Sequence, residues 1–112
     1  MDVPKQSALL RIYTDEKARA GHKALFEAIV LKARDQAIAG ATVLRGPMGY
    51  GQSHRIHTAS ILNLSESLPL VIEIVDDESK LREFINTLES FKDIGLVTLE
   101  KVEVVHYGSV EP

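Results

Sequence analysis

The chain has 112 residues, which is enough for one compact domain spanning residues 1–112 and too short for a second. It is 45% hydrophobic and 26% charged, and its net charge of −3 argues against general attraction to nucleic acid or to anionic membranes. There is no cysteine, so disulfides, thiolate metal sites and thiol nucleophiles are all excluded.

The charge is distributed unevenly along the chain. Up to Arg55 there are nine Lys or Arg and five Asp or Glu, a balance of about +4, whereas the remainder has four and eleven, about −7. An anion site is therefore expected in the first half. No apolar run approaches the ~18 residues of a membrane span, and the N-terminus lacks a signal-peptide pattern. We expect a cytoplasmic protein without membrane insertion.

The first half of the chain predicts a strand, a helix and a second strand. Residues 8–14 are apolar and β-branched, as in a strand. Apolar residues then recur every three or four positions from Leu25 towards Ala39, which predicts an amphipathic helix. Gly40 is expected to close this helix in a left-handed conformation. A strand over residues 41–45 follows, and three glycines and a proline end it over residues 46–51.

The second half predicts a loop, a strand, a helix and a final strand. Residues 52–67 lack periodicity and suggest a long loop with room for a short strand. The apolar run 68–75 predicts a central strand, and the acidic segment 76–79 precedes a helix. The last strand is expected over residues 96–107, with a bulge.

This β-α-β-β-α-β order indicates an α+β, ferredoxin-like fold, with an antiparallel sheet and both helices on one face. The other face of the sheet would remain uncovered. Strand side chains alternate between faces, so Leu9, Val43, Ile72 and Val104 cannot all point at the helices together with their neighbours. A surplus of apolar residues on the uncovered face predicts self-association.

The glycine-rich segment after the second predicted strand carries a family resemblance. The chain resembles the PII signalling superfamily, and most closely the PII-like proteins of domain-of-unknown-function family 190 (DUF 190), over almost its whole length. The matching segments are residues 21–26, 40–43, 45–46, 49–51 and 68–69. The resemblance implies a trimer of ferredoxin-like subunits, with small-molecule sites in the clefts between neighbours and a mobile loop after the second strand.

The resemblance also implies a ligand site at the glycine-rich turn. PII proteins bind adenine nucleotides partly through a Gly-aromatic-Gly turn and a nearby Gln, and Gly49, Tyr50, Gly51 and Gln52 resemble that element. Glycines leave backbone N–H groups open to an anion or supply a positive φ. Flanking arginines add positive charge, so the expected ligand-binding residues are Arg45, Gly46, Gly49, Tyr50, Gly51, Gln52 and Arg55.

A second glycine-rich turn with a lysine completes the phosphate site of PII proteins, between the last helix and the last strand. At this position the present chain has the segment 91–97, in which Gly95 and Lys92 are the residues that could replace it. The resemblance is therefore closer at the turn 49–52 than at the second phosphate-binding turn, residues 91–97.

Two other groups of residues invite sharper interpretations. His54 and His57 could bind a metal, but a third ligand would have to come from His22, His106 or another subunit, and solvated loop histidines are the simpler interpretation. The acidic segment 76–78 is most simply a helix N-terminus. The six aromatic residues do not match an RNA-recognition surface.

These observations predict a non-enzymatic regulatory or sensor protein. It would form a homotrimer, bind a small anionic metabolite or nucleotide between subunits, and signal to a partner protein through the loop 52–67. Neither a cofactor nor nucleic acid is expected. The alternative is a trimeric enzyme or metal-handling protein that uses His54 and His57 in the same cleft.

Overall fold

A computed structural model describes residues 3–59 and 67–110. Its main elements are β1 (Gln6–Asp15), α1 (Leu25–Asp35), β4 (Gly40–Arg45), β7 (Pro69–Asp76), α2 (Glu78–Thr87) and β8 (Val97–Glu103). The four long strands form an antiparallel sheet in the order β4-β7-β1-β8. The predicted ferredoxin-like α+β fold is confirmed.

The smaller elements lie at one end of this sheet. They are β2 (Arg19–Ala20), β3 (Lys23–Ala24), β5 (Met48–Gly49), β6 (His57–Thr58) and the 3-10 helix η1 (Leu88–Ser90). Strands β2 and β3 form one short hairpin and β5 and β6 another. Strand β6 is the short strand allowed for in the expected loop 52–67, whose residues 60–66 lie outside the described part of the chain.

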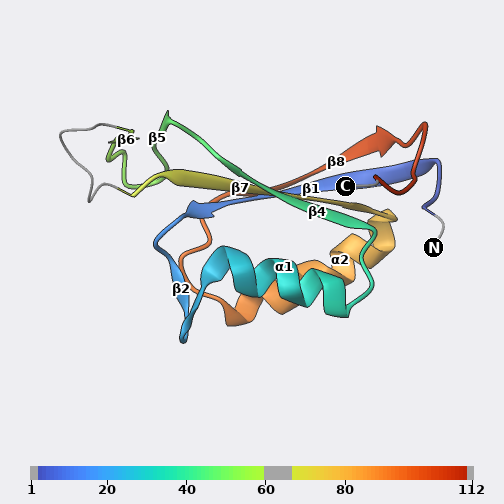
Figure 1. Cartoon of the computed structure of the whole chain (residues 1–112), viewed down its shortest axis with the longest axis horizontal. Helices are drawn as coiled ribbons and strands as arrows, with labels where there is room; N and C mark the ends of the chain where they lie inside the picture. The colour runs from blue at the N-terminus through green and yellow to red at the C-terminus, as the bar shows by residue number, and fades with distance from the viewer. Residues whose placement is uncertain (1–2, 60–66, 111–112) are drawn as a thin grey trace.

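The core lies between the sheet and the two helices, which cover the same face (Figure 1). Strand residues alternate between faces, so every second residue of the central strands is buried against the helices. The buried apolar residues of β1 and β7 are Ala8, Leu10, Ile12, Leu70, Ile72 and Ile74, and those of the helices are Leu25, Ile29, Ala33, Leu81 and Phe84.

The uncovered face of the sheet is less apolar than the sequence suggested. Arg11 lies at its centre and contacts Glu73 at 3.0 Å and Glu100 at 2.6 Å. Hydrogen bonds to Glu73 and then to Glu100 raise the pKa of Arg11 above its usual value. Leu9 lies on this face and is half-buried, but Val43 pairs with the buried Ile72 and therefore faces the helices. The face thus combines apolar residues with an ionic cluster.

The end of α1 differs from the prediction. The helix ends at Asp35, and Ala37, not Gly40, adopts the left-handed conformation, with φ 58°. The N–H of Ala37 bonds to Arg34 and that of Ile38 to Ala33, both at 3.0 Å, which is a Schellman ending. Burial of Ile38 fixes this ending, so Gly40 is free to begin β4.

The last strand also differs from the prediction. Strand β8 ends at Glu103, four residues before the expected Tyr107, and its register against β1 is unbroken from Val97 to Glu103, so the expected bulge is wrong. No helix among residues 3–59 and 67–110 is long and apolar enough to cross a membrane.

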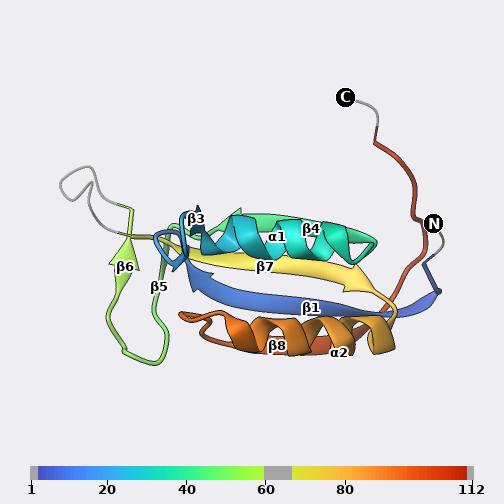
Figure 2. The same cartoon turned by 90° about the horizontal axis from the view of Figure 1, so that it is seen from below.

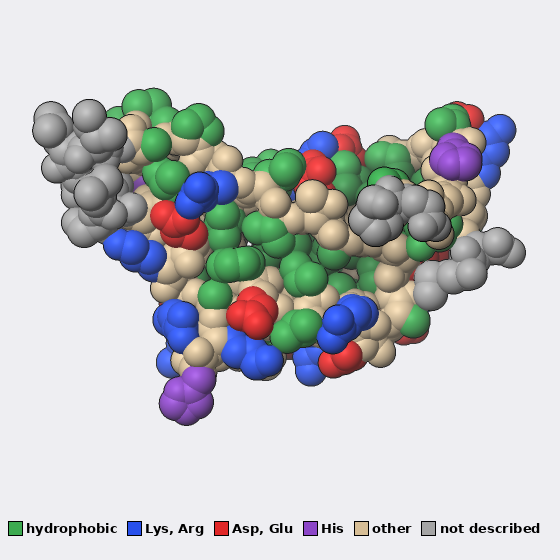
Figure 3. All heavy atoms as spheres, viewed as in Figure 1, with side chains coloured by type: hydrophobic (Ala, Val, Ile, Leu, Met, Phe, Trp, Pro, Cys, Tyr) green, Lys and Arg blue, Asp and Glu red, His purple; other side chains and the backbone are tan. Residues whose placement is uncertain are grey.

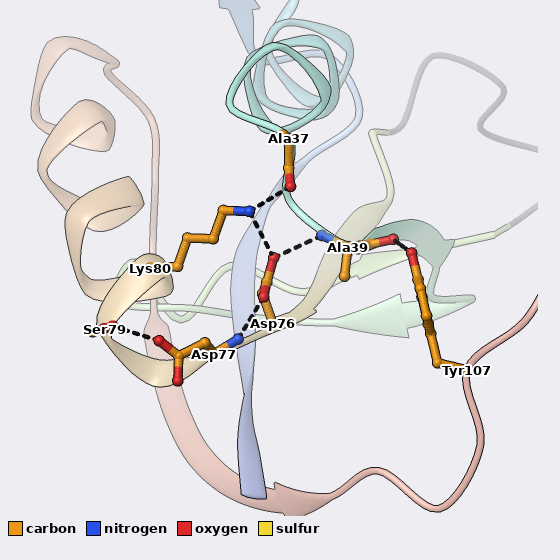
Figure 4. Close-up of polar contacts among 7 residues, drawn as sticks. All are labelled: Ala37, Ala39, Asp76, Asp77, Ser79, Lys80 and Tyr107. Carbon is orange, nitrogen blue, oxygen red and sulfur yellow. Dashed lines mark hydrogen bonds and ion pairs between the residues drawn. The ribbon is translucent and has the colours of Figure 1, made fainter. Parts of the chain in front are cut away.

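A buried carboxylate joins the two crossover connections at one end of the sheet (Figure 4). Asp76, the last residue of β7, is 3% exposed. Its side chain accepts hydrogen bonds from the N–H of Ala39 at 2.8 Å and that of Asp77 at 2.6 Å. Lys80 lies 3.4 Å from the same carboxylate and donates to the carbonyl of Ala37 at 2.6 Å. Asp76 therefore connects the start of β4 with the start of α2.

We expect Asp76→Ala to lower the free energy of unfolding by about 3 kcal/mol, because it leaves two partly buried N–H groups without their acceptor and removes the buried carboxylate that pairs with Lys80. Urea denaturation would measure the loss. Asp77→Ala is the matched control, since the Asp77 side chain caps no backbone group of α2. Equal losses in the two variants would contradict the role given to Asp76.

Candidate functional site

An open cleft of about 890 Å³ lies at the end of the sheet where β1 finishes and β7 begins. Its walls come from four segments that are distant in the sequence, together with His57. The lining residues are 13–15, 46, 48–52, 57, 69–71 and 93–96. The glycine-rich turn predicted as the ligand site forms one wall.

Pro69 shapes the glycine-rich wall. The N–H of Gly46 donates to the carbonyl of Pro69 at 2.9 Å. A Cβ atom on Gly46 or Gly49 would lie 3.3 or 3.2 Å from the Pro69 ring, so these glycines allow the turn to approach β7 closely. Neither they nor Gly51 have a positive φ, so the positive φ considered for this turn is wrong. Gly46 and Gly49 are needed because a side chain there would crowd Pro69, and not because of their backbone conformation.

The loop before β8 forms the opposite wall, and β1 holds it by backbone hydrogen bonds. The N–H of Tyr13 donates to Leu96 and the N–H of Gly95 donates back to Tyr13, each at 2.8 Å. The Thr14 hydroxyl donates to the carbonyl of Asp93 at 2.7 Å. Gly95 therefore lies in the cleft as a structural glycine, whereas Lys92 does not line it.

The turn presents both polar and apolar groups to the cleft. Within the described residues, the N–H groups of Gly51 and Gln52 have no hydrogen-bond acceptor, and a Cβ atom on Gly51 would meet open space. Tyr50 is 65% exposed, and its ring centroid lies 5.5 Å from that of His54. The exposed Leu96 lies across the cleft on the other wall. The cleft thus combines backbone donors with apolar surface.

The two predicted arginines lie outside the cleft lining. Arg45 is held 3.2 Å from Glu16, and Arg55 is exposed on the turn before β6. Among the described residues that line the cleft, the ionisable ones are Asp15, Asp93, His57, Tyr13 and Tyr50, and none is a Lys or Arg. The structure therefore brings together Gly46, Gly49, Tyr50, Gly51 and Gln52, but not the cations expected beside them.

Sequence reasoning missed Tyr13, Pro69 and Asp93 as lining residues. Pro69 belongs to the Leu-Pro pair that contributed to the family resemblance, and this pair was the available signal. No sequence pattern indicated Tyr13 and Asp93, because their place in the cleft depends on the pairing of β1 with β8.

The histidines do not form a metal centre within the described residues. No group of three or more His, Asp or Glu in this part of the chain could hold a metal ion. His57 lines the cleft and His54 follows the turn, but His22 lies in the β2–β3 hairpin and His106 follows β8 at the opposite end of the sheet.

The fold is that of the PII-like proteins. Two solved structures of CPII from Thiomonas intermedia K12 align with it. The structure bound to ADP and bicarbonate has a TM-score of 0.66 at 16% identity, covering 90% of each chain. The structure bound to ADP, AMP and bicarbonate has a TM-score of 0.63 at 15% identity, covering 93% of this chain and 99% of that one.

Within this class the chain belongs to the DUF190 family, described as "Uncharacterized ACR", whose model matches residues 7–104. A UPF0166 protein of Aquifex aeolicus is 38% identical over 98 residues, which cover 88% of this chain and 92% of that protein. A UPF0166 protein of Methanocaldococcus jannaschii is 30% identical over 100 residues, with the same two coverages.

The contact with Pro69 predicts different tolerances at two glycines. Gly49→Ala should be about 1 kcal/mol less stable than Gly51→Ala, because its new methyl group collides with the proline ring whereas that on Gly51 enters open space. Both variants lose similar freedom in the unfolded chain, so their difference isolates the contact. Urea denaturation of the pair would measure it, and equal stabilities would show that the turn has no close fit to Pro69.

Proposed function

We propose that this chain is a PII-like regulatory protein that binds a small anionic metabolite or nucleotide in the cleft beside the glycine-rich turn. The observation that supports this proposal is that, within the described residues, the N–H groups of Gly51 and Gln52 donate no hydrogen bond. They lie next to the exposed Tyr50 in an open cleft. Such amides can hold an anion, and the aromatic surface suits a flat ring. The family fold supports this proposal, because CPII is bound to ADP and bicarbonate.

The missing positive charge favours a site shared between copies. Two carboxylates and no Lys or Arg line the described cleft, so an anionic ligand needs a cation from beyond the lining. Arg55 is the candidate from the same turn, since Arg45 is engaged by Glu16. A neighbouring subunit of a homotrimer would supply further contacts. The loop 52–67 continues from this wall and would carry the signal to a partner protein.

We expect ADP, AMP or bicarbonate to raise the melting temperature, because a ligand that binds only the folded state stabilises it. Gly51→Val places a branched side chain beside the open amides and should weaken binding at least tenfold by calorimetric titration. Arg55→Ala should weaken it by about 1.5 kcal/mol or more if the guanidinium bonds the anion, and Arg45→Ala far less.

Ala59→Val, outside the cleft lining, is the control for this titration. Wild-type affinity in both Gly51→Val and Arg55→Ala would place the ligand elsewhere. A response to divalent metals alone, lost in His57→Ala, would instead favour the metal-handling alternative that uses His54 and His57.

The proposed homotrimer should have three times the mass of one 12.4 kDa chain. The uncovered sheet face, with half-buried apolar residues around the Arg11 cluster, offers area for such association. Light scattering after size exclusion at micromolar concentration would measure the mass. A monomeric mass both with and without ligand would refute a site shared between subunits. If that monomer still bound the ligand, the proposal that the cleft is the ligand site would stand.

A further inference from the structure

Strand β4 has a free edge that lacks the usual protection. It pairs with β7 on one side, and on the other no described strand adjoins it. Its one charged residue is the terminal Arg45, which pairs with Glu16. From Gly40 to Leu44 the strand contains no charged residue and no proline, and Leu44 is 49% exposed. Figure 3 views this side, and hydrophobic and uncharged side chains predominate on the part of it that the grey atoms leave visible. Proteins protect exposed edges with lysine, proline or bulges, because a bare edge recruits another strand.

The other edge strand of the sheet shows the contrast. Strand β8 carries Glu100, Lys101 and Glu103 within seven residues, and all three are exposed. These alternating charges protect it against unspecific pairing. The bare edge of β4 is therefore a particular feature of that strand.

The C-terminal tail, residues 105–110, is an extended segment without a strand partner. Within the described residues none of its backbone groups makes a hydrogen bond, and Val105 and Val110 are 86% and 94% exposed. A hollow of about 500 Å³ lies against its beginning. Valine and tyrosine favour strands, so this composition suits pairing better than solvent exposure.

The tail lies on the same side of the molecule as the bare edge. It leaves β8, passes the end of the sheet and projects outward on the side of α1 and β4 (Figure 2). The Tyr107 hydroxyl donates to the carbonyl of Ala39, directly before β4, at 2.7 Å (Figure 4). This contact fixes where the tail leaves the molecule.

We propose that residues 105–110 of one copy add as a strand to the free edge of β4 in a second copy. This inference rests on the self-association proposed above and names the surfaces involved. The tail does not cover β4 of its own chain, because both stay exposed while Tyr107 is anchored at Ala39. A neighbour lying along the β4 side receives the projecting tail. Strand addition satisfies the backbone groups of both segments and buries their valine and leucine side chains.

The absence of cysteine allows a direct test by disulfide trapping. Thr42→Cys marks the edge and Val105→Cys marks the tail, and both positions are exposed. The two single variants are mixed, one of them labelled with ¹⁵N, and oxidised at micromolar concentration. Mass spectrometry should find the mixed-isotope disulfide between positions 42 and 105, at least tenfold above that formed by a Ser90→Cys control with the same tail variant.

A second substitution tests the edge itself. Thr42→Lys adds a charge at the bare edge, so a trap between Ala41→Cys and Val105→Cys should fall at least fivefold when it is present, whereas Ser90→Lys should leave the trap unchanged. An assembled wild type with no 42–105 disulfide above the control overturns the inference and leaves the proposed function intact. A monomeric wild type overturns both the inference and the proposed assembly, and ADP titration then tests the cleft separately.

Discussion

Strand β1 is the element on which the rest of the structure depends. It pairs with β7 on one side and β8 on the other, and Ala8, Leu10 and Ile12 are completely buried beneath the helices. Because a strand buries alternate residues, the opposite row of β1 places Arg11 between the two glutamates of the uncovered face. The final residues of the same strand bond the loop 93–96 and pair with the start of β7. One strand therefore sets the core, the open face and the cleft.

The overall fold could be predicted because its signals are local and agree with one another. Helical spacing identified α1 and α2, and apolar runs identified the long strands within a few residues. The end of α1 could not be predicted from Gly40. The helix ends earlier because Ile38 is buried in the core, which requires Ala37 to adopt the left-handed conformation. A packing gain in the core outweighed the conformational preference of glycine.

The candidate site could be predicted in part. The glycine pattern and the family resemblance marked the turn, because its residues adjoin in sequence. The opposite wall could not be predicted, since the bond between Thr14 and Asp93 depends on strand pairing between segments some eighty residues apart in the chain. The placement of Arg45 was equally hidden, because Glu16, which pairs with it, lies 29 residues away in the sequence. Contacts of this kind depend on the three-dimensional register.

The two ends of the sheet are held by different kinds of bond. Side chains hold the end near Asp76, so a single substitution can remove the connection. Backbone groups provide most of the bonds at the cleft end, through Gly46 and Pro69 on one wall and Tyr13 and Gly95 on the other, beside the side-chain bond of Thr14. Every residue carries a backbone carbonyl and every residue except proline an N–H, so these bonds do not depend on which side chains stand at positions such as 48, 50 and 52. The chemistry of the cleft can therefore diversify during evolution while its architecture persists.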